Sequence, residues 1–98
     1  MINVDNNVEL MKSSETAIAY FTADWCGPCK QLKPQIAKLA LSDNENTYFV
    51  LDVDKIDQEY LTEYNIKSVP RVFKMRNGAI EKEISSRTSD AILQEINE

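Results

Sequence analysis

The sequence contains no histidine, and its only cysteines are Cys26 and Cys29. A structural zinc site normally takes four cysteine or histidine ligands, so one copy of this chain cannot complete such a site, and we expect no metal. The 98 residues still suffice to bury a core without a metal or a disulfide framework. They are enough for one small domain and too few for two.

Positive charge and long apolar runs are also scarce. Lysine and arginine number 11 against 16 aspartates and glutamates, a net charge of −5 that argues against general nucleic-acid binding. The longest apolar runs, near residues 17–21 and 48–51, are too short to cross a bilayer. The first ten residues, MINVDNNVEL, lack the basic and apolar regions of a secretory signal. We therefore expect a cytoplasmic protein in a reducing compartment, without nucleic-acid or membrane partners.

With only two glycines and three prolines, the chain has no linker-like stretch, and we find no repeat. Two apolar runs, Ile18–Ala23 and Thr47–Val53, predict buried parallel strands because they are largely continuous rather than alternating. Between them, the spacing of apolar residues over Pro28–Leu41 predicts a helix. The residues expected on its buried face are Cys29, Leu32, Ile36, Leu39 and Ala40.

A second helix is predicted over Asp57–Tyr64, with Asp57 as its N-cap. Its inner side is expected to carry Tyr60, Leu61 and Tyr64. Asn65 follows where a helix often ends in a left-handed residue.

The remaining chain predicts a hairpin and two further helices. Asn-Gly at 77–78, between Arg71–Met75 and Ala79–Ile84, is a strong signal for a two-residue hairpin turn. The helices are expected over Asn6–Ser13 and Ser89–Asn97. Their apolar residues are Val8 and Met11 in the first, and Ile92, Leu93 and Ile96 in the second. The order is (β)αβαβαββα, with no residues assigned to the bracketed strand. It predicts an α/β fold with a mixed central sheet flanked by helices.

The stretch TADWCGPCK places both cysteines at the start of the first long helix. Cys26 precedes the helical run, where backbone N–H groups and the helix dipole favour a thiolate, so it is the expected nucleophile. Cys29 shares a face with Leu32 and should be shielded, which suits a resolving thiol. Pro28 fits the first helical turn, and Gly27 leaves room for an approaching chain. A structural disulfide, two inert thiols and a zinc site shared by two chains remain less favoured alternatives.

The segment WCGPCK is similar to the active-site signature of the thioredoxin family, and C-x-x-C at the entry of a βαβ helix is a general mark of that fold. Three ordered segments carry the resemblance: DWCGPCKQLKP, FVLDVDK and YNIKSVPRVFKMRNG. It covers all but about the first fifteen residues. It implies a single thioredoxin-like domain over residues 1–98.

By this resemblance, Cys26 attacks a client disulfide and Cys29 resolves the mixed disulfide. Pro70 matches the family's cis-proline, and the backbone of Val69 would pair with the client. Recycling would come from a separate NADPH-dependent thioredoxin reductase, so the domain itself should bind no cofactor. No thiol is left for a stable intermolecular disulfide outside the active site, and we expect a monomer.

Trp25 resembles the surface tryptophan beside the nucleophile, and Asp54 the carboxylate that accepts its indole N–H. Two positions depart from the family's pattern. Tyr20 stands where thioredoxins usually have a buried aspartate, and Val50 stands where its lysine partner is usual. Both members of the charged pair are replaced together, which is energetically better than leaving one charge buried without its partner. Tyr20 is nevertheless a poor base near neutral pH, because the ordinary pKa of tyrosine is about 10.

Further departures surround the cysteines. Arg71 follows Pro70 in place of the usual threonine or serine, and Ser85 and Ser86 stand where a glycine is expected. Scattered solvated charge is one interpretation of the nearby cations. The other is a basic patch around Cys26 that stabilises its thiolate and makes the couple more oxidising. The cations that would form this patch are Arg71, Lys30, Lys33 and Lys67.

The leading functional prediction is a protein-disulfide reductase of thioredoxin type, acting in electron transport and cell redox homeostasis. A glutathione-coupled or more oxidising thiol–disulfide oxidoreductase is the enzymatic alternative. A thioredoxin-fold interaction subunit with a dispensable cysteine pair is the non-enzymatic one.

Overall fold

The computed structural model describes residues 1–5 and 7–98 and is built around one five-stranded sheet. The elements are β1 (Ile2–Asn3), α1 (Val8–Lys12), β2 (Thr16–Thr22), α2 (Gly27–Ser42), β3 (Thr47–Asp52), α3 (Gln58–Glu63), β4 (Arg71–Arg76), β5 (Ala79–Ile84) and α4 (Ser89–Ile96). Their order confirms the predicted order and the α/β class.

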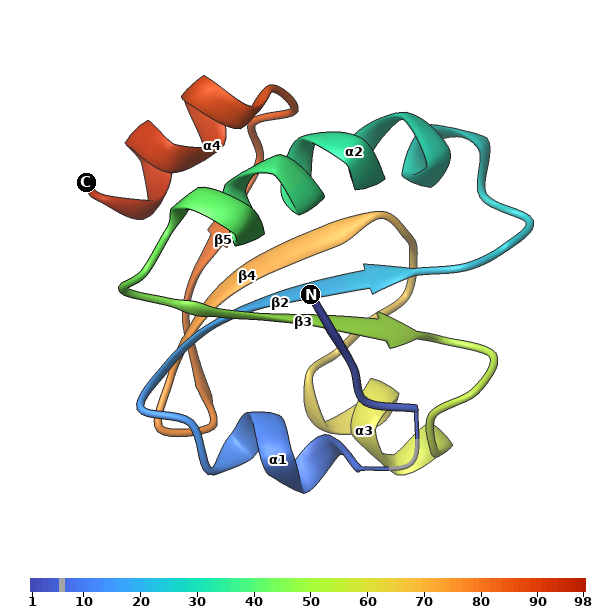
Figure 1. Cartoon of the computed structure of the whole chain (residues 1–98). Coiled ribbons are helices and arrows are strands. Elements are labelled where there is room, and N and C mark those ends of the chain that lie inside the picture. Colours follow the sequence, from blue (N-terminus) through green and yellow to red (C-terminus); the bar gives the residue numbers. More distant parts are fainter. Residues whose placement is uncertain (6) are drawn as a thin grey trace.

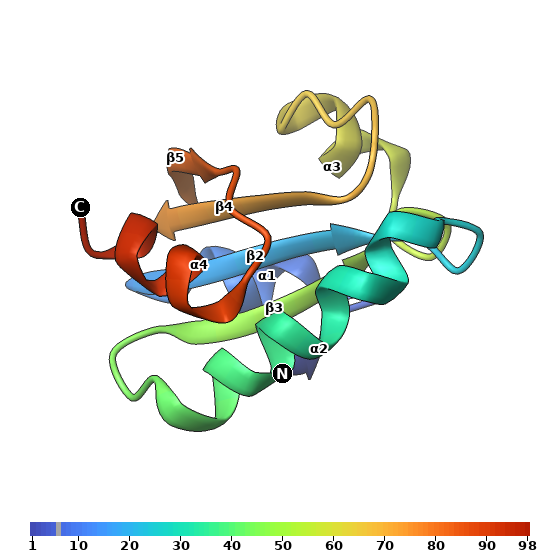
Figure 2. The ribbon, with the colours of Figure 1, turned by 90° about the horizontal axis from the view of Figure 1, so that it is seen from above.

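The sheet has the strand order β1-β3-β2-β4-β5. Strands β1, β3 and β2 run parallel, whereas β4 pairs antiparallel with β2, and β5 antiparallel with β4. Helices α2 and α4 cover one face of the sheet, and α1 and α3 lie on the other (Figure 1). Figure 2, seen from above, shows α2 and α4 lying over their common face. None of the helices in the described part of the chain is long and apolar enough to cross a membrane.

Each face of the sheet carries its own apolar core. The core under α2 and α4 is formed by Ile18, Tyr20, Leu32, Ile36, Leu39, Tyr48, Val50, Val72, Ile84, Ile92 and Ile96. The core under α1 and α3 includes Val4, Val8, Met11, Phe21, Phe49, Leu51, Ile56, Tyr64, Phe73 and Met75. Side chains of a strand alternate between the two faces, so the continuous apolar runs of β2 and β3 supply both cores.

Strand register decides what lies beneath the start of α2. Tyr20 pairs with Val50, and Thr22 pairs with Asp52, in the parallel β2–β3 ladder. Residues two apart on a strand point to the same face, so Asp52 follows Val50 on the side covered by α2. This pairing confirms that Val50 lies beside Tyr20.

Three left-handed residues confirm the predicted turns. Asn77 and Gly78 have φ angles of 52° and 84°, as a two-residue hairpin requires, and Asn65 has a φ of 56° after α3. A Cβ atom at Gly78 would also lie 2.9 Å from the carbonyl oxygen of Lys12, so this glycine permits the hairpin to touch α1.

Some local predictions need correction. Leu93 was expected in the apolar stripe of α4, but it is 37% exposed because the stripe is narrower than predicted and faces the sheet through Ile92 and Ile96. Asp57 is at the N-cap of α3, but its side chain makes no capping hydrogen bond. Helix α1 begins at Val8, and the predicted start at Asn6 lies outside the described residues.

Candidate active site

The two cysteines lie where β2 passes into α2. Cys26 is the N-cap of α2 and Pro28 lies in its first turn, as the sequence predicts. A disulfide joins Cys26 to Cys29, with their Cα atoms 5.3 Å apart, so the structure shows the oxidised form of the pair. Both cysteines are buried, and they pack with Ala23 in a small cluster.

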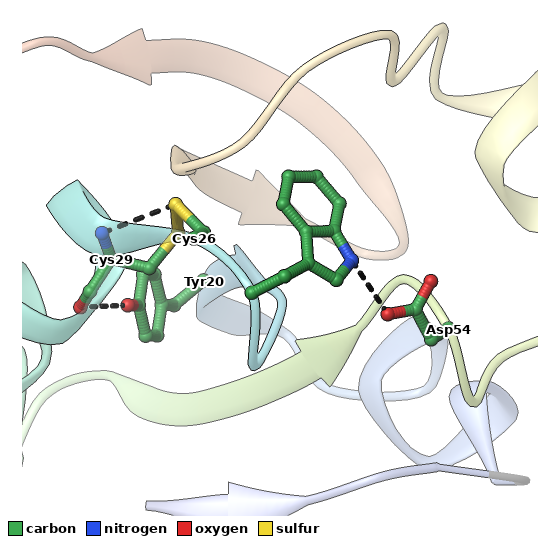
Figure 3. Close-up of a disulfide and its surroundings, with 5 residues drawn as sticks. Tyr20, Cys26, Cys29 and Asp54 are labelled. Atoms are coloured by element: carbon green, nitrogen blue, oxygen red, sulfur yellow. Dashed lines mark hydrogen bonds between the residues drawn. A yellow bond between two sulfur atoms is a disulfide. The ribbon is translucent and has the colours of Figure 1, made fainter.

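The sulfur of Cys26 receives the backbone N–H of Cys29 at 3.2 Å (Figure 3). A donor at this position, together with the helix dipole, favours negative charge on the sulfur once the disulfide is reduced. Both cysteines are deeply buried, with 4% of the Cys26 surface and 2% of the Cys29 surface exposed. The hydrogen bond and the helix terminus therefore favour Cys26 over Cys29 as the thiolate, whereas the burial of the two side chains barely differs.

Trp25 is 68% exposed, which agrees with the surface tryptophan expected from the sequence. Its indole Nε1 donates a hydrogen bond to Oδ2 of Asp54 at 2.8 Å, as predicted (Figure 3). The bond anchors a large exposed ring beside the cysteines.

A groove runs beside the cysteine pair. It has a volume of about 120 Å³ and is lined by Trp25, Val53, Leu61, Ile66, Lys67, Ser68 and Val69. Val53 and Val69 also pack against the cysteine cluster, and they join the groove to the disulfide. The peptide bond between Val69 and Pro70 is cis, as the resemblance implies. A Cβ atom at Gly27 would meet nothing within 4 Å, so this side of the disulfide is open.

Tyr20 lies beneath the cysteines and is fully buried. Its hydroxyl donates a hydrogen bond to the backbone carbonyl oxygen of Cys29 at 2.8 Å (Figure 3). Burial raises the pKa of Tyr20, so the hydroxyl stays protonated at neutral pH and acts as a donor. Tyr20 therefore ties β2 to the first turn of α2, and it is not the base that a carboxylate would be.

The predicted basic residues do not gather in one place. Arg71 forms a two-point ion pair with Glu83, with nitrogen–oxygen distances of 2.6 and 3.0 Å. Lys30 and Lys33 line a cavity on the Cys29 side, whereas Lys67 lines the groove beside Trp25. The charge of Arg71 is largely offset by Glu83, and the effect of Arg71 on the Cys26 thiolate stays a prediction.

Three acidic residues near these positions were not singled out from the sequence. Glu83 pairs with Arg71, and the Glu95 carboxylate accepts the backbone N–H groups of Ser85 and Ser86, each at 3.0 Å. Asp52 ends the apolar run of β3 as a buried carboxylate. Only Asp52 carries a signal in the sequence, a charged residue inside a stretch predicted to be a buried strand.

The family model for thioredoxin matches residues 2–98. The chain belongs to the thioredoxin family. It is 35% identical to Thioredoxin-2 of Dictyostelium discoideum over 81 residues, which are 81% of this chain and 91% of that protein. It is 33% identical to a thioredoxin of Mycoplasmoides gallisepticum, covering 80% of each chain.

Some relatives are longer proteins. A TPR repeat-containing thioredoxin of Arabidopsis thaliana is 37% identical over 67 residues, which are 68% of this chain but 17% of that protein. Among solved structures, Plasmodium falciparum thioredoxin has a TM-score of 0.85 at 27% identity, with 99% of this chain and 97% of that chain covered. Family membership together with a cysteine pair that forms a disulfide supports thiol–disulfide oxidoreductase activity.

Proposed function

We propose that this protein is a protein-disulfide reductase in which Cys26 is the nucleophile and Cys29 the resolving thiol. The observation that carries the proposal is the position of the Cys26 sulfur. It lies at the N-terminus of α2, accepts the Cys29 N–H at 3.2 Å and adjoins an open groove. An inert structural disulfide has no need of this electrostatic setting.

In the first step, the Cys26 thiolate attacks one sulfur of a client disulfide. A bond forms between Cys26 and that sulfur, the client bond breaks, and the other client sulfur leaves as a thiolate. In the second step, Cys29 loses its proton and attacks the Cys26 sulfur. The Cys26–Cys29 bond forms and the second client sulfur leaves, so the client gains two electrons and the protein loses two.

The groove residues supply the docking surface for the client. Trp25 and Val69 line it, and Pro70 holds the chain that carries Val69 beside the cysteine cluster. Gly27 and Pro28 are exposed beside the disulfide, where a client backbone would pass. A separate NADPH-dependent thioredoxin reductase returns the pair to the dithiol, and the setting is a reducing cytoplasm.

Turnover of a model protein disulfide tests this proposal, with NADPH and a thioredoxin reductase as the source of electrons. The wild-type protein should turn over, and Cys26→Ser should abolish turnover. Cys29→Ser should also lose turnover while still reacting once through Cys26. Turnover of the wild type no faster than the uncatalysed reaction would contradict the proposal and favour a non-catalytic interaction subunit.

A more oxidising or glutathione-coupled enzyme is a second candidate, favoured by Tyr20 and Val50 at the base of the site. At the position that Tyr20 occupies beneath the cysteines, a neutral hydroxyl stands where thioredoxins usually carry a negative charge. A stabilised thiolate makes the reduced form more stable and the couple more oxidising. Equilibration with glutathione decides between the two: a potential near about −270 mV favours the reductase, and one above roughly −220 mV favours this alternative.

A further inference from the structure

Asp52 carries the only carboxylate that is buried among residues 1–5 and 7–98, with 7% of its surface exposed. Its Oδ1 accepts the backbone N–H of Asp54 at 2.9 Å, in the turn that follows β3. No other hydrogen bond to this carboxylate occurs within the described residues. Burying a carboxylate is unfavourable unless charges and hydrogen bonds compensate for the lost hydration. Apart from this one hydrogen bond in the turn, what surrounds the carboxylate is the cavity that it lines, together with Lys30, Lys33 and Lys55.

The Asp52 carboxylate lines a cavity that Cys29 also lines. This cavity has a volume of about 480 Å³ and lies between α2, the ends of β2 and β3, and β1. Strand register places Asp52 beside Thr22 and one step beyond Val50 on the face that α2 covers. The buried thiol and the buried carboxylate therefore border one space, which is large enough to hold several water molecules.

Other polar groups around this cavity are poorly suited to remove a proton from Cys29. Lys30, Lys33 and Lys55 are exposed ammonium groups, which donate hydrogen bonds and do not accept them. Asp24 is an exposed carboxylate in the connection between β2 and α2. The Tyr20 hydroxyl is already a donor to the Cys29 carbonyl oxygen. Asp52 is left as the buried acceptor.

We propose that Asp52 accepts, through water in this cavity, the proton that Cys29 gives up when it resolves the mixed disulfide. This inference rests on the proposed function, because it concerns the second of its two steps. Cys29–SH loses its proton to the Asp52 carboxylate, the Cys29 thiolate attacks the Cys26 sulfur, and the client sulfur leaves with the bonding electron pair. The leaving thiolate takes a proton from solvent, and Asp52 returns its proton to the cavity water.

A two-step assay with an aromatic disulfide such as 5,5′-dithiobis(2-nitrobenzoate) separates the two steps. Attack by Cys26 on the reagent releases one coloured thiolate, and resolution by Cys29 releases the second. The decisive variant is Asp52→Asn, which removes the charge and keeps an oxygen for the Asp54 N–H. Asp24→Asn is its matched control, because it removes the same charge from an exposed position on the same cavity.

Near neutral pH, Asp52→Asn should slow the second release by about 10²-fold, the lower end of what a positioned acid–base group contributes. The first release should stay within about twofold of wild type, and Asp24→Asn should keep both phases. The slowing of the second release should shrink as the pH rises past the ordinary pKa of a cysteine thiol, about 8.5, because the thiolate then forms without a base. Asp52→Glu, which keeps a carboxylate, should restore part of the second phase.

A second phase of Asp52→Asn equal to that of Asp24→Asn would overturn this inference, as would an equal loss in both phases at every pH. Loss of the first phase in the wild type would instead overturn the proposed function. If Asp52→Asn does not fold, Asp52→Ser with added formate replaces it, because the cavity admits a small carboxylate. Formate should accelerate the second phase of that variant, and no response to formate would equally overturn the inference.

Discussion

The hydroxyl of Tyr20 donates a hydrogen bond to the carbonyl oxygen of Cys29 at 2.8 Å, across the contact between β2 and α2. Pro34 lies inside α2. The missing N–H of Pro34 frees the carbonyl of Lys30, four residues earlier, and not that of Cys29, so the Cys29 carbonyl accepts the Tyr20 hydroxyl through its second lone pair. The backbone of Cys29 is therefore held from below by a neutral side chain.

Tyr20→Phe tests how much this hydrogen bond contributes. The phenyl ring keeps the packing and removes only the donor, so the free energy of unfolding should fall by about 1 kcal/mol. Urea denaturation of the oxidised protein measures the change. Tyr60→Phe is the control, because the Tyr60 hydroxyl bonds Glu9 at 3.3 Å on the surface and its loss should change stability far less. Equal effects of the two substitutions would contradict the role of Tyr20.

Tyr20→Asp should destabilise the protein by roughly 3–5 kcal/mol at neutral pH, because it places an unpaired carboxylate in an apolar core. Burial raises the pKa of such a carboxyl above its unfolded value, so the loss should grow as the pH rises and shrink toward acidic pH. Val50 is the register partner of Tyr20. Adding Val50→Lys should therefore recover part of the loss. A double variant less stable than Tyr20→Asp alone would contradict this account.

The ion pair of Arg71 with Glu83 predicts opposite effects of two substitutions on the Cys26 thiolate. Glu83→Gln frees the guanidinium and should lower the pKa of Cys26, whereas Arg71→Thr leaves Glu83 unbalanced and should raise it. Ultraviolet titration of the thiolate, in a Cys29→Ser background, measures both. Identical titration curves in the three proteins would show that this pair does not influence the nucleophile.

Asp43, at the C-terminal end of α2, predicts an acid-dependent contribution to stability away from the active site. Partial burial opposes its ionisation, but hydrogen bonds from Asn46, Tyr48 and the Glu45 N–H outweigh it and hold the pKa of Asp43 below its ordinary value. The pKa of Asp43 is lower in the folded protein than in the unfolded one. Its contribution to stability is therefore fully present at a pH above the unfolded-state pKa, and it is lost as the pH falls through the folded-state pKa.

Asp43→Asn should therefore cost about 1 kcal/mol at pH 7, less than the roughly 1.5–3 kcal/mol of hydrogen bonds to a buried charged group, because solvent screens the partly exposed Asp43. The difference in the free energy of unfolding between Asp43→Asn and the wild type should shrink as the pH is lowered below the ordinary pKa of aspartate, about 3.9. Urea unfolding across this range measures it. Asp57→Asn serves as the control, because the Asp57 side chain makes no capping bond to α3. A constant difference at all pH values would contradict the assignment to ionisation.

Most elements were predictable because their signals are local. The Asn-Gly turn at 77–78 requires two left-handed residues, and the apolar spacing of α2 identifies its buried face without reference to the sheet. Strand β1 was not located, because Ile2–Asn3 is only two exposed residues and has no periodic pattern. Leu93 was misplaced because its exposure depends on how α4 crosses the sheet, which helical spacing alone does not determine.

In the site, too, residues within local motifs were predictable, whereas contacts made by long-range pairing were not. Cys26, Cys29, Trp25 and Asp54 were predictable because a contiguous motif and an ordered second segment carry them. The partner of Arg71 was not, because Glu83 becomes its neighbour only when β4 and β5 pair. Similarly, the Tyr20 hydroxyl finds the Cys29 carbonyl only after α2 packs on the sheet. Long-range pairing determines such contacts, and a single sequence contains no direct record of it.

Trapping the mixed disulfide shows whether Cys26 attacks a client disulfide and whether Cys29 is needed to resolve the product. Reduced Cys29→Ser protein is mixed with a client disulfide, and the covalent product is digested and mapped by mass spectrometry. We predict a stable adduct on Cys26 in Cys29→Ser, and none with Cys26→Ser under the same conditions. An adduct that forms on Cys29 when Cys26 is replaced, or no adduct in either variant, would contradict the account.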